Sequence, residues 1–301
     1  MSEPAFAFGD AEFYLADCFE WLAERRRNSV QGVVTDPPYG LVEYTEKELA
    51  KRRNGRGGIW RIPPSFDGHQ RSPVPRFTVL TEADMSRLYV FFRRWAKLLF
   101  PVVVPGAHIT VASNPLLAPV VATALKRAGF ERRGQIVRLV QTMRGGDRPK
   151  NAHDEFADVT VMPKSQHEPW VLVRKPLEGR VQDNLRAWKT GGLRRPSSEQ
   201  PFGDVIRSSP TRREEREHAP HPSLKPQAFL RQLVRAILPL GEGVVLDPFA
   251  GSGSTLAAAE AVGYASIGVD NDPSNAAMAE TAIAALAALE VGARTRVYSS
   301  R

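Results

Sequence analysis

A carboxylate, two prolines and an aromatic ring follow one another directly after an apolar run near the N-terminus. The residues are Asp36, Pro37, Pro38 and Tyr39, and they come after Val33-Val34-Thr35. Proline fixes its own φ and has no N–H group, so this turn offers hydrogen-bond acceptors and few donors. The tyrosine ring adds an apolar face on which a planar group can stack. Together these groups suit a nucleobase that carries an exocyclic NH₂ group.

The amino group of such a base is a poor nucleophile because its lone pair is delocalised into the ring. The carboxylate of Asp36 and the carbonyl of Pro37 could each accept one N–H bond and so localise that lone pair on nitrogen. Asp36 is also a candidate acceptor for the proton released after transfer. Taken alone, the segment is also compatible with a turn that ends a strand and carries an ordinary surface aspartate.

A glycine-punctuated loop lies near the other end of the sequence. Residues 244–246 are apolar, Gly251 and Gly253 follow, and the next apolar run ends at Asp270. Glycine allows positive φ and close approach of a ligand, and a carboxylate after the next strand is the usual partner of ribose hydroxyls. Leu256 departs from a dinucleotide fingerprint, and no Gly-Lys-Ser/Thr ending cradles a phosphate.

The cofactor expected at this loop therefore has a ribose and no phosphate. Asp247, at the start of the loop, suits a cationic amine. S-adenosylmethionine meets these demands because it joins an adenosine ribose to an amino acid end and a sulfonium methyl group. A glycine turn with a purely structural role is the alternative.

The composition limits the class of protein. The chain has 301 residues and a formal net charge of +8. A single cysteine cannot form an intrachain disulfide, and no Cys/His cluster has zinc-ligand spacing, so we expect a reducing compartment and no metal. No apolar run reaches the roughly 18–20 residues of a membrane-spanning helix, and the N-terminus lacks signal-peptide features. We expect a soluble cytoplasmic protein, with a polyanion as one candidate partner.

The basic surplus is concentrated in two segments. Residues 47–76 contain eight basic and two acidic residues, and residues 174–216 contain eleven and six, so the rest of the chain carries a net charge of −3. Both segments are rich in Gly, Pro and Ser and lack regular periodicity, which predicts long loops. Such loops are usually functional or disordered. Nucleic-acid binding and a solvated arginine-rich loop are both open at this point.

Outside those segments, short β-branched runs alternate with stretches of helical periodicity. This pattern predicts an α/β fold with a mostly parallel, doubly wound sheet covered on both faces. Ligands of such sheets bind beyond the carboxyl ends of the strands, here in the loops after Thr35, Leu246 and Val269. The expected strands are 29–35, 108–112, 135–140, 158–162, 170–173, 243–246 and 266–269, and the expected helices are 83–100, 116–127, 227–238, 255–261 and 274–289.

The combination of Asp36-Pro-Pro-Tyr39 with Asp247-Pro-Phe-Ala-Gly-Ser-Gly-Ser-Thr255 resembles the exocyclic-amino DNA methyltransferases, which act on adenine N6 or cytosine N4. The order, with the catalytic tetrapeptide first and the glycine loop last, is similar to their β class. His221-Pro-Ser-Leu-Lys-Pro226 supports the resemblance, as does Ala16-Asp17-Cys18, where Ala16 replaces the usual glycine. The resemblance implies a Rossmann-like class I methyltransferase fold with S-adenosylmethionine as cofactor.

The resemblance also implies roles for residues that match the family's motifs. Asp17 would lie near the cofactor adenine, and His221 and Lys225 would shape the methionyl pocket, with capping of the next helix as the alternative. The predicted catalytic residues are Asp36, Pro37, Pro38 and Tyr39. The predicted cofactor-binding residues are Asp17, Cys18, His221, Ser223, Lys225, Asp247, Phe249, Gly251, Ser252, Gly253, Thr255 and Asp270. The predicted DNA-binding residues are Lys51, Arg52, Arg53, Arg56, Arg186, Lys189, Arg194 and Arg195.

The predicted activity is site-specific methylation of adenine N6 in double-stranded DNA after base flipping. Asp rather than Ser at position 36 favours adenine in this family, and cytosine N4 is the nearest alternative. An RNA amino-methyltransferase and a non-catalytic nucleic-acid-binding relative are more distant ones, and Leu256 disfavours a nicotinamide-dependent oxidoreductase.

The same resemblance implies a division of the chain and a biological setting. Residues 1–173 and 217–301 would form the catalytic domain, residues 174–216 the target-recognition region and residues 44–78 a basic loop insertion. A prokaryotic or phage origin, close to the nucleoid, is expected. A homodimer and a cognate restriction endonuclease stay open.

Overall fold

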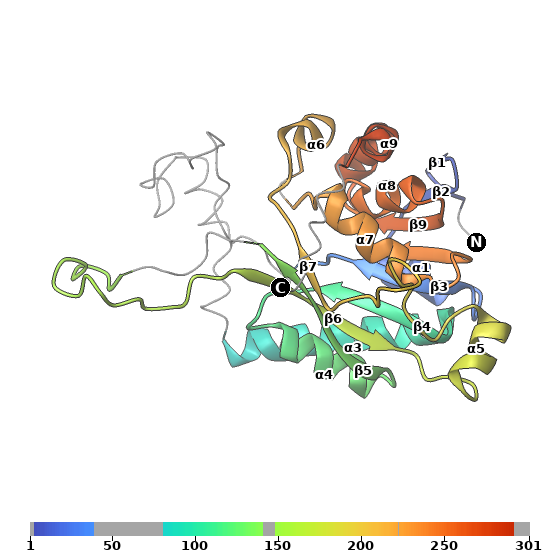
Figure 1. The fold of residues 1–301 in the computed structure, drawn as a ribbon, viewed down its shortest axis with the longest axis horizontal. Coiled ribbons are helices and arrows are strands. Elements are labelled where there is room, and N and C mark those ends of the chain that lie inside the picture. Colours follow the sequence, from blue (N-terminus) through green and yellow to red (C-terminus); the bar gives the residue numbers. More distant parts are fainter. Residues whose placement is uncertain (1–2, 39–80, 141–147, 222, 292–301) are drawn as a thin grey trace.

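The computed structural model describes residues 3–38, 81–140, 148–221 and 223–291, and these contain one nine-stranded sheet (Figure 1). The strand order is β1-β2-β9-β8-β3-β4-β6-β5-β7. The strands from β2 to β4 in this order run parallel, as do β5 and β7, while β1 and β6 run antiparallel to their neighbours. The predicted mostly parallel α/β sheet is confirmed. The strands are β1 (Phe6–Phe8), β2 (Ala11–Leu15), β3 (Val30–Thr35), β4 (Val103–Ala112), β5 (Glu131–Leu139), β6 (His167–Arg174), β7 (Val205–Arg207), β8 (Val244–Asp247) and β9 (Ala265–Asp270).

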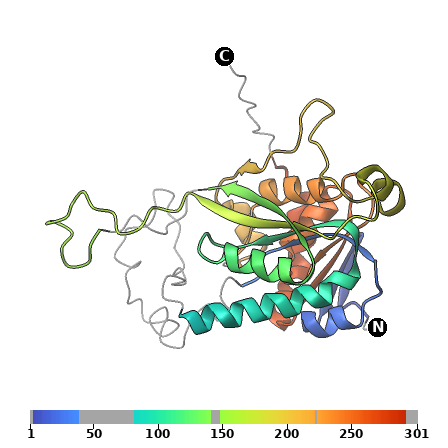
Figure 2. The same cartoon turned by 90° about the horizontal axis from the view of Figure 1, so that it is seen from below.

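Helices cover both faces of the sheet (Figures 1 and 2). One face packs against α1 (Cys18–Ala23), α3 (Glu82–Val102) and α4 (Ala118–Arg127). The other packs against α7 (Gln227–Ile237), α8 (Ser254–Ala261) and α9 (Pro273–Ala288). Two short helices lie outside these layers: α5 (Val181–Trp188) contacts β4, and α6 (Arg213–His218) contacts α9.

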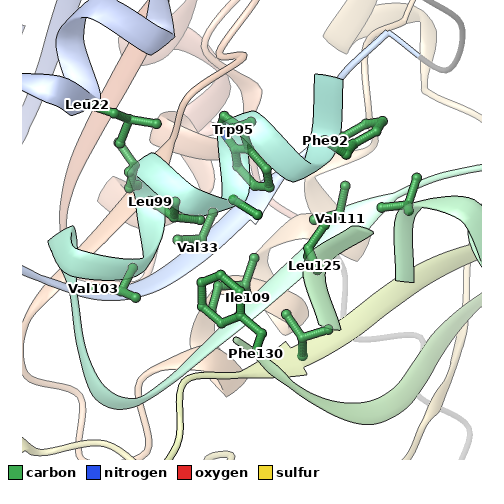
Figure 3. Close-up of a cluster of buried hydrophobic side chains, with 14 of the residues drawn as sticks. Leu22, Val33, Phe92, Trp95, Leu99, Val103, Ile109, Val111, Leu125 and Phe130 are labelled. Carbon is green, nitrogen blue, oxygen red and sulfur yellow. The ribbon is translucent and has the colours of Figure 1, made fainter. Parts of the chain in front are cut away.

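Side chains of the central strands alternate between the two hydrophobic cores, one on each face of the sheet. In β3, Val33 belongs to the core under α3 and α4, whereas Val34 belongs to the core under α7 and α8. Figure 3 shows Val33 close to Ile109 of β4 and to Trp95 and Leu99 of α3. Successive side chains of a strand point to opposite faces, so a strand buried on both sides must be apolar throughout, as residues 33–34 are.

The strand order reverses between β3 and β8. The connection through α3 carries the chain from β3 to β4 along one face, and the connection through α8 carries it from β8 to β9 along the other. Ligands of doubly wound sheets bind outside the carboxyl ends of the strands at such a switch point. We call the edge where β2, β9, β8, β3 and β4 end the carboxyl edge, and the opposite one the amino edge.

Some sequence predictions were wrong in type or extent. Residues 158–162 form no strand, although they are β-branched in part, because all five are exposed and strand propensity depends on a surface to pack against. β4 begins five residues before the predicted 108, and it accommodates Pro105 where the register with β3 is irregular. β1, β2, β7, α1, α5 and α6 were not predicted, and each has at most eight residues.

Candidate active site

A direct hydrogen bond joins the carboxyl ends of β3 and β8. Thr35 Oγ1 donates to Asp247 Oδ1 at 2.7 Å, and both residues are buried. The two residues are 212 positions apart in the sequence. Since the strand order reverses here, the loops after the two strands begin at one point and border the same crevice. The predicted catalytic turn and the predicted cofactor loop therefore meet.

Asp36 is the first residue of the predicted catalytic turn. Its side chain is 17% exposed, and its Oδ2 atom accepts a hydrogen bond from the ammonium group of Lys225. Pro37 is buried and Pro38 is exposed. Tyr39 lies outside the described residues, so its stacking role stays a prediction. The carboxylate that the sequence singled out thus lies at the carboxyl edge with a cation directly against it.

Glycine is required at positions 251 and 253 of the loop for different structural reasons. Both have positive φ, +51° at Gly251 and +79° at Gly253. A Cβ on Gly253 would lie 2.6 Å from Ile283, so Gly253 is needed where α8 approaches α9. A Cβ on Gly251 would come within 4 Å of His221 alone, at 3.8 Å. The backbone at Gly251 therefore borders open space next to His221, which suits a ligand.

Asp270 fastens the glycine loop from the end of β9. Its Oδ2 accepts the Gly251 N–H at 2.9 Å, and its Oδ1 accepts the Asp272 N–H at 3.0 Å and the Asn275 Nδ2 at 3.1 Å. An ionised carboxylate has about four acceptor sites. With three donors from the chain bound, Asp270 keeps capacity for a ligand hydroxyl.

The Asp17 segment lies beside Asp270, as the cofactor prediction requires. The Ala16 N–H donates to the Asp270 carbonyl at 2.9 Å. Asp17 itself caps α1, since its Oδ1 accepts the N–H groups of Phe19 at 2.8 Å and Glu20 at 3.2 Å. Burial raises the pKa of the Cys18 thiol to about 12. The thiol is therefore protonated at neutral pH, and its packing is what it contributes.

The side chain of Asp247 forms hydrogen bonds within the protein. Its Oδ1 accepts the bond from Thr35 and the Phe249 N–H at 3.1 Å, and Thr255 also hydrogen-bonds to its side chain. Burial raises the pKa of Asp247 to about 6, against the effect of these hydrogen bonds. Asp247 thus ties β8, β3 and α8 together, and its contact with a cofactor amine stays a prediction.

His221 lies between the two halves of the site. Burial lowers the pKa of its imidazole, while the nearby carboxylates of Asp36 and Asp270 act in the opposite direction. Its Nδ1 accepts the Ser223 N–H at 3.2 Å, which fixes the ring orientation. His221 therefore lies next to Gly251, in the predicted cofactor region. The side chain of Ser223 is exposed, and Ser223 orients His221 through its backbone N–H.

The remaining predicted residues of the glycine loop, Ser252, Thr255 and Phe249, pack against the protein interior. Ser252 and Thr255 are buried, with relative exposures of 3% and 4%. The ring of Phe249 lies 6.1 Å from that of Phe91 and 6.0 Å from that of Trp95, both of α3. These contacts fix the loop against the helix layer on the β3–β4 side.

Two charged residues of the site, Arg138 and Glu168, were not predicted. Lys225 Nζ lies 4.0 Å from Glu168 Oε2, and Arg138 Nη1 lies 3.3 Å from the same oxygen. Arg138 and Glu168 face each other in the β5–β6 register. The available signal was a charged residue close to apolar strand residues, Arg138 after Ile136-Val137 and Glu168 before Trp170-Val171, but nothing in the sequence indicated that they pair.

The predicted DNA-binding residues fall into two groups. Lys51, Arg52, Arg53 and Arg56 lie outside the described residues.

The other four predicted DNA-binding residues lie at the amino edge. Helix α5 carries Arg186 and ends before Lys189. It is held at the start of β4 by a 3.0 Å hydrogen bond from Asn184 Nδ2 to Pro105 O. There Arg194 Nη1 donates to Tyr264 Oη at 2.6 Å, and the Arg195 carbonyl accepts a bond from Arg235. The start of β4 pairs with Val30, which precedes Thr35 by five residues along β3, a distance of about 17 Å. The structure does not bring these four residues to the catalytic turn.

A projecting arm, residues 148–166, leaves the body at the carboxyl edge. It precedes β6, whose Trp170 pairs with Ala112 at the end of β4. Figures 1 and 2 both show it extending from the end of the molecule opposite α5. Residues 153–164 are all exposed. Four of them are large and apolar: Phe156, Val159, Val161 and Met162.

The described part of the chain contains neither a metal-ligand cluster nor a membrane-spanning helix. No three His, Cys, Asp or Glu side chains are gathered so that they could hold a metal ion. No helix there is long and apolar enough to cross a membrane.

Comparisons with known proteins agree with this arrangement. Residues 30–281 match the model of a DNA methylase family, N6_N4_Mtase. The Type II methyltransferase M2.DpnII of Streptococcus pneumoniae is 23% identical over 271 residues, which cover 90% of this chain and 88% of the relative. The Type II methyltransferase M.HindIII of Haemophilus influenzae is 23% identical over 284 residues, covering 86% and 90%.

Solved structures show the same fold. TTHA0409 of Thermus thermophilus, described as a DNA modification methylase and complexed with S-adenosyl-L-methionine, has a TM-score of 0.54 at 21% identity, over 92% of this chain and 94% of its own. The cytosine-N4-specific PvuII DNA methyltransferase has a TM-score of 0.59 at 13% identity, over 96% and 89%. Because the family model spans most of the sequence, from β3 to α9, the chain belongs to the DNA methylase family of N6 and N4 methyltransferases.

Proposed function

We propose that the protein transfers a methyl group from S-adenosylmethionine to N6 of adenine in a specific sequence of double-stranded DNA. The observation that carries this proposal is the meeting of Asp36 with the Gly251–Asp270 loop pair at one switch point of the sheet. Membership of the DNA methylase family supports it. A base inside a duplex cannot reach such a crevice, so the target adenine must flip out of the helix.

The residues present fit S-adenosylmethionine. Asp270 has acceptor capacity for a ribose hydroxyl, Gly251 leaves room beside its backbone, and the Asp17 segment lies next to both. The loop has no lysine for a phosphate, in keeping with a cofactor that has none. When bound, the cofactor supplies an electrophilic methyl group, whose bond to sulfur breaks as the bond to the target nitrogen forms.

The catalytic turn then acts on the target amino group. The Asp36 carboxylate and the Pro37 carbonyl accept its two N–H bonds, which localises the nitrogen lone pair for attack. After transfer, the Asp36 carboxylate takes the proton that the methylated nitrogen must lose. Asp36 is thus a hydrogen-bond acceptor first and a base second.

The DNA is proposed to run along the carboxyl edge, past the projecting arm. That edge holds Asp36, and the arm presents Phe156 and its apolar neighbours together with Arg148, Lys150 and Lys164. Apolar side chains can insert between base steps and open the stack, while lysine and arginine bind phosphates. We propose the cytoplasm of a prokaryote as the protein's place of action, because the matched Type II methyltransferases are bacterial. Sedimentation with and without DNA tests for a homodimer.

The decisive experiment is the chemical identification of the product. The protein is incubated with methyl-labelled S-adenosylmethionine and either DNA or RNA, and the nucleic acid is digested to nucleosides. We expect label in N6-methyladenine from DNA. Label in N4-methylcytosine alone would show the cytosine alternative, label in RNA alone would change the substrate, and no label with bound cofactor would indicate a non-catalytic relative. Sequencing of modified genomic DNA from a methylation-free host then gives the target sequence.

A further inference from the structure

The cation against the catalytic carboxylate is itself held by a second ion pair. Lys225 Nζ contacts Asp36 Oδ2 and lies 4.0 Å from Glu168 Oε2. The side chains of Lys225, Asp36 and Glu168 are only 10%, 17% and 14% exposed. We propose that Lys225, held by Glu168 and Arg138, is a positioning residue that fixes the Asp36 carboxylate for methyl transfer. This inference rests on the proposed function.

Two contacts besides Lys225 fix Glu168. Its Oε2 pairs with Arg138 Nη1 at 3.3 Å, and its Oε1 accepts the Trp170 Nε1–H at 2.8 Å. Arg138 is held in turn, because its Nε donates to Ser208 Oγ at 3.0 Å and its guanidinium lies 5.3 Å from the centre of the Phe229 ring. The anchor of Lys225 is therefore rigid.

The four charges alternate in sign from the crevice inwards. The order is Asp36, Lys225, Glu168 and Arg138, so each buried charge has an opposite neighbour and the group is neutral. Removing one partner from such a group leaves its neighbour buried without compensation. The arrangement stabilises one geometry of Asp36, which would otherwise rotate about two side-chain torsions at the end of β3.

Lys225 can orient Asp36 without competing for its chemistry. A protonated lysine has three donors and no acceptor, so it cannot take the proton from the target nitrogen. It binds one carboxylate oxygen and thereby sets the direction of the whole group. A misplacement of about 1 Å in a catalytic group can lower the rate about 100-fold, so fixing this direction is a catalytic requirement.

This role differs from the cofactor role that the sequence predicted for Lys225. A residue of the methionyl pocket would affect the binding of S-adenosylmethionine. A residue that acts through Asp36 would affect kcat, and only while Asp36 is present. The two roles are therefore separable by measurement.

The experiment measures methyl transfer to DNA under single-turnover conditions, together with the Kd for S-adenosylmethionine from calorimetry, for the full chain. Lys225→Met is expected to lower the transfer rate about 100-fold and to leave the Kd within about twofold. Lys225→Arg should recover part of the rate. Glu168→Gln, which removes one charge from the anchor, should lower the rate about tenfold at unchanged Kd, as an intermediate misplacement. Lys175→Met is the matched control, because that lysine bonds Val103 O at the amino edge and should not change the rate.

The double variant Asp36→Ala with Lys225→Met gives the sharpest outcome. If Lys225 acts through Asp36, adding Lys225→Met to Asp36→Ala lowers the residual rate no further. An equal loss in both backgrounds, or a tenfold weaker Kd with unchanged rate, would overturn the inference and leave the proposed function intact. A wild-type protein that methylates neither DNA nor RNA would overturn the proposed function and the inference with it.

Discussion

Charged side chains support the two edges of the sheet in opposite ways. At the carboxyl edge, four aspartates accept bonds from backbone N–H groups at the starts of loops and helices. At the amino edge, arginines and lysines donate to backbone carbonyls and to Tyr264. The acceptors are Asp17, Asp247, Asp270 and Asp272, and the donors are Arg174, Lys175, Arg194 and Arg235.

The direction of the helices explains three of these contacts: Asp17 and Asp272 cap the N-termini of α1 and α9, and Lys175 donates to the carbonyl of Val103, the C-cap of α3. In a βαβ unit each helix runs back against its strand, so helix N-termini gather at the carboxyl edge and C-termini at the amino edge. N-termini present free N–H groups and a partial positive charge, and C-termini present carbonyls and a partial negative charge. Acidic side chains at helix N-termini and basic side chains at helix C-termini therefore stabilise any such sheet. Part of the net charge of +8 belongs to the scaffold, and does not by itself indicate DNA.

Asp36 breaks the pattern, because it faces a lysine side chain and stands next to the crevice. Asp36→Ala is expected to lower the methyl transfer rate by about 10²–10⁴-fold, the usual contribution of a general base. The Kd for S-adenosylmethionine should be unchanged, because the cofactor loop is fastened by other residues. Radiolabel transfer and calorimetry measure the two quantities. Full activity of Asp36→Ala would remove the mechanistic basis of the proposal.

Asp270 and Asp272 are neighbours at the carboxyl edge with different expected roles. Asp270→Ala should weaken S-adenosylmethionine binding about 10–100-fold, because a hydrogen bond to a charged group contributes about 1.5–3 kcal/mol. Asp272→Ala removes the N-cap of α9, whose oxygen accepts the Ser274 N–H at 2.8 Å, and should lower the free energy of unfolding by about 1 kcal/mol. Cofactor titration and urea unfolding of both variants separate the two effects. Equal loss of cofactor affinity in both would show that the edge acts as one unit.

Two buried titratable groups should respond to pH in opposite directions. Burial raises the pKa of Asp247 from 3.8 to about 6, so the unfolded chain releases its proton first and stability falls as pH rises through this window. Burial, reinforced by Arg174 and Arg133, lowers the pKa of His108 from 6.5 to about 3. The unfolded chain then binds the proton first, so stability falls as pH drops between these values.

Substitutions at the two positions should therefore change the pH profile with opposite sign. Asp247→Asn should make the free energy of unfolding rise more steeply with pH between about 4 and 6, and His108→Gln should make it rise less, each by at most about 1.4 kcal/mol per pH unit. Urea unfolding at three pH values across this window measures the change. His153→Gln is the control, since that side chain is 63% exposed. Shifts of the same sign at positions 108 and 247 would contradict the assignment of the two groups.

The sequence predicted best what is encoded locally. The glycine loop, the Asp36 turn and the buried strands at residues 29–35 and 266–269 depend on neighbouring residues, and the structure places them as predicted. The contact between Lys225 and Asp36 joins residues 189 positions apart through a flexible side chain, so no local pattern encodes it. The edge to which Arg194 belongs is likewise decided by how residues 174–216 pack, which charge counting does not reveal.

The smallest effect is expected where the sequence placed DNA contacts and the structure places the amino edge. Arg186 is 76% exposed and pairs with Asp183 at 3.3 Å, and Lys189 follows α5 with a φ of +62°. Because this edge lies about 20 Å from the level of Asp36, Arg186→Ala with Lys189→Ala should change the Kd for DNA by less than about twofold and leave its salt dependence unaltered.

Arg52, Arg53 and Arg56 provide the contrasting set, since they follow the catalytic turn in the sequence. Each phosphate contact contributes about 0.9 to the slope of log K against log salt concentration, so neutralising all three should flatten that slope by up to about 3. Fluorescence anisotropy with labelled duplex at several salt concentrations measures both sets. The opposite result would be a flatter slope for the Arg186 and Lys189 variant and an unchanged slope for the arginine triplet. DNA would then bind along the amino edge, at residues 174–216. The duplex would have to span both edges for a flipped base to reach Asp36.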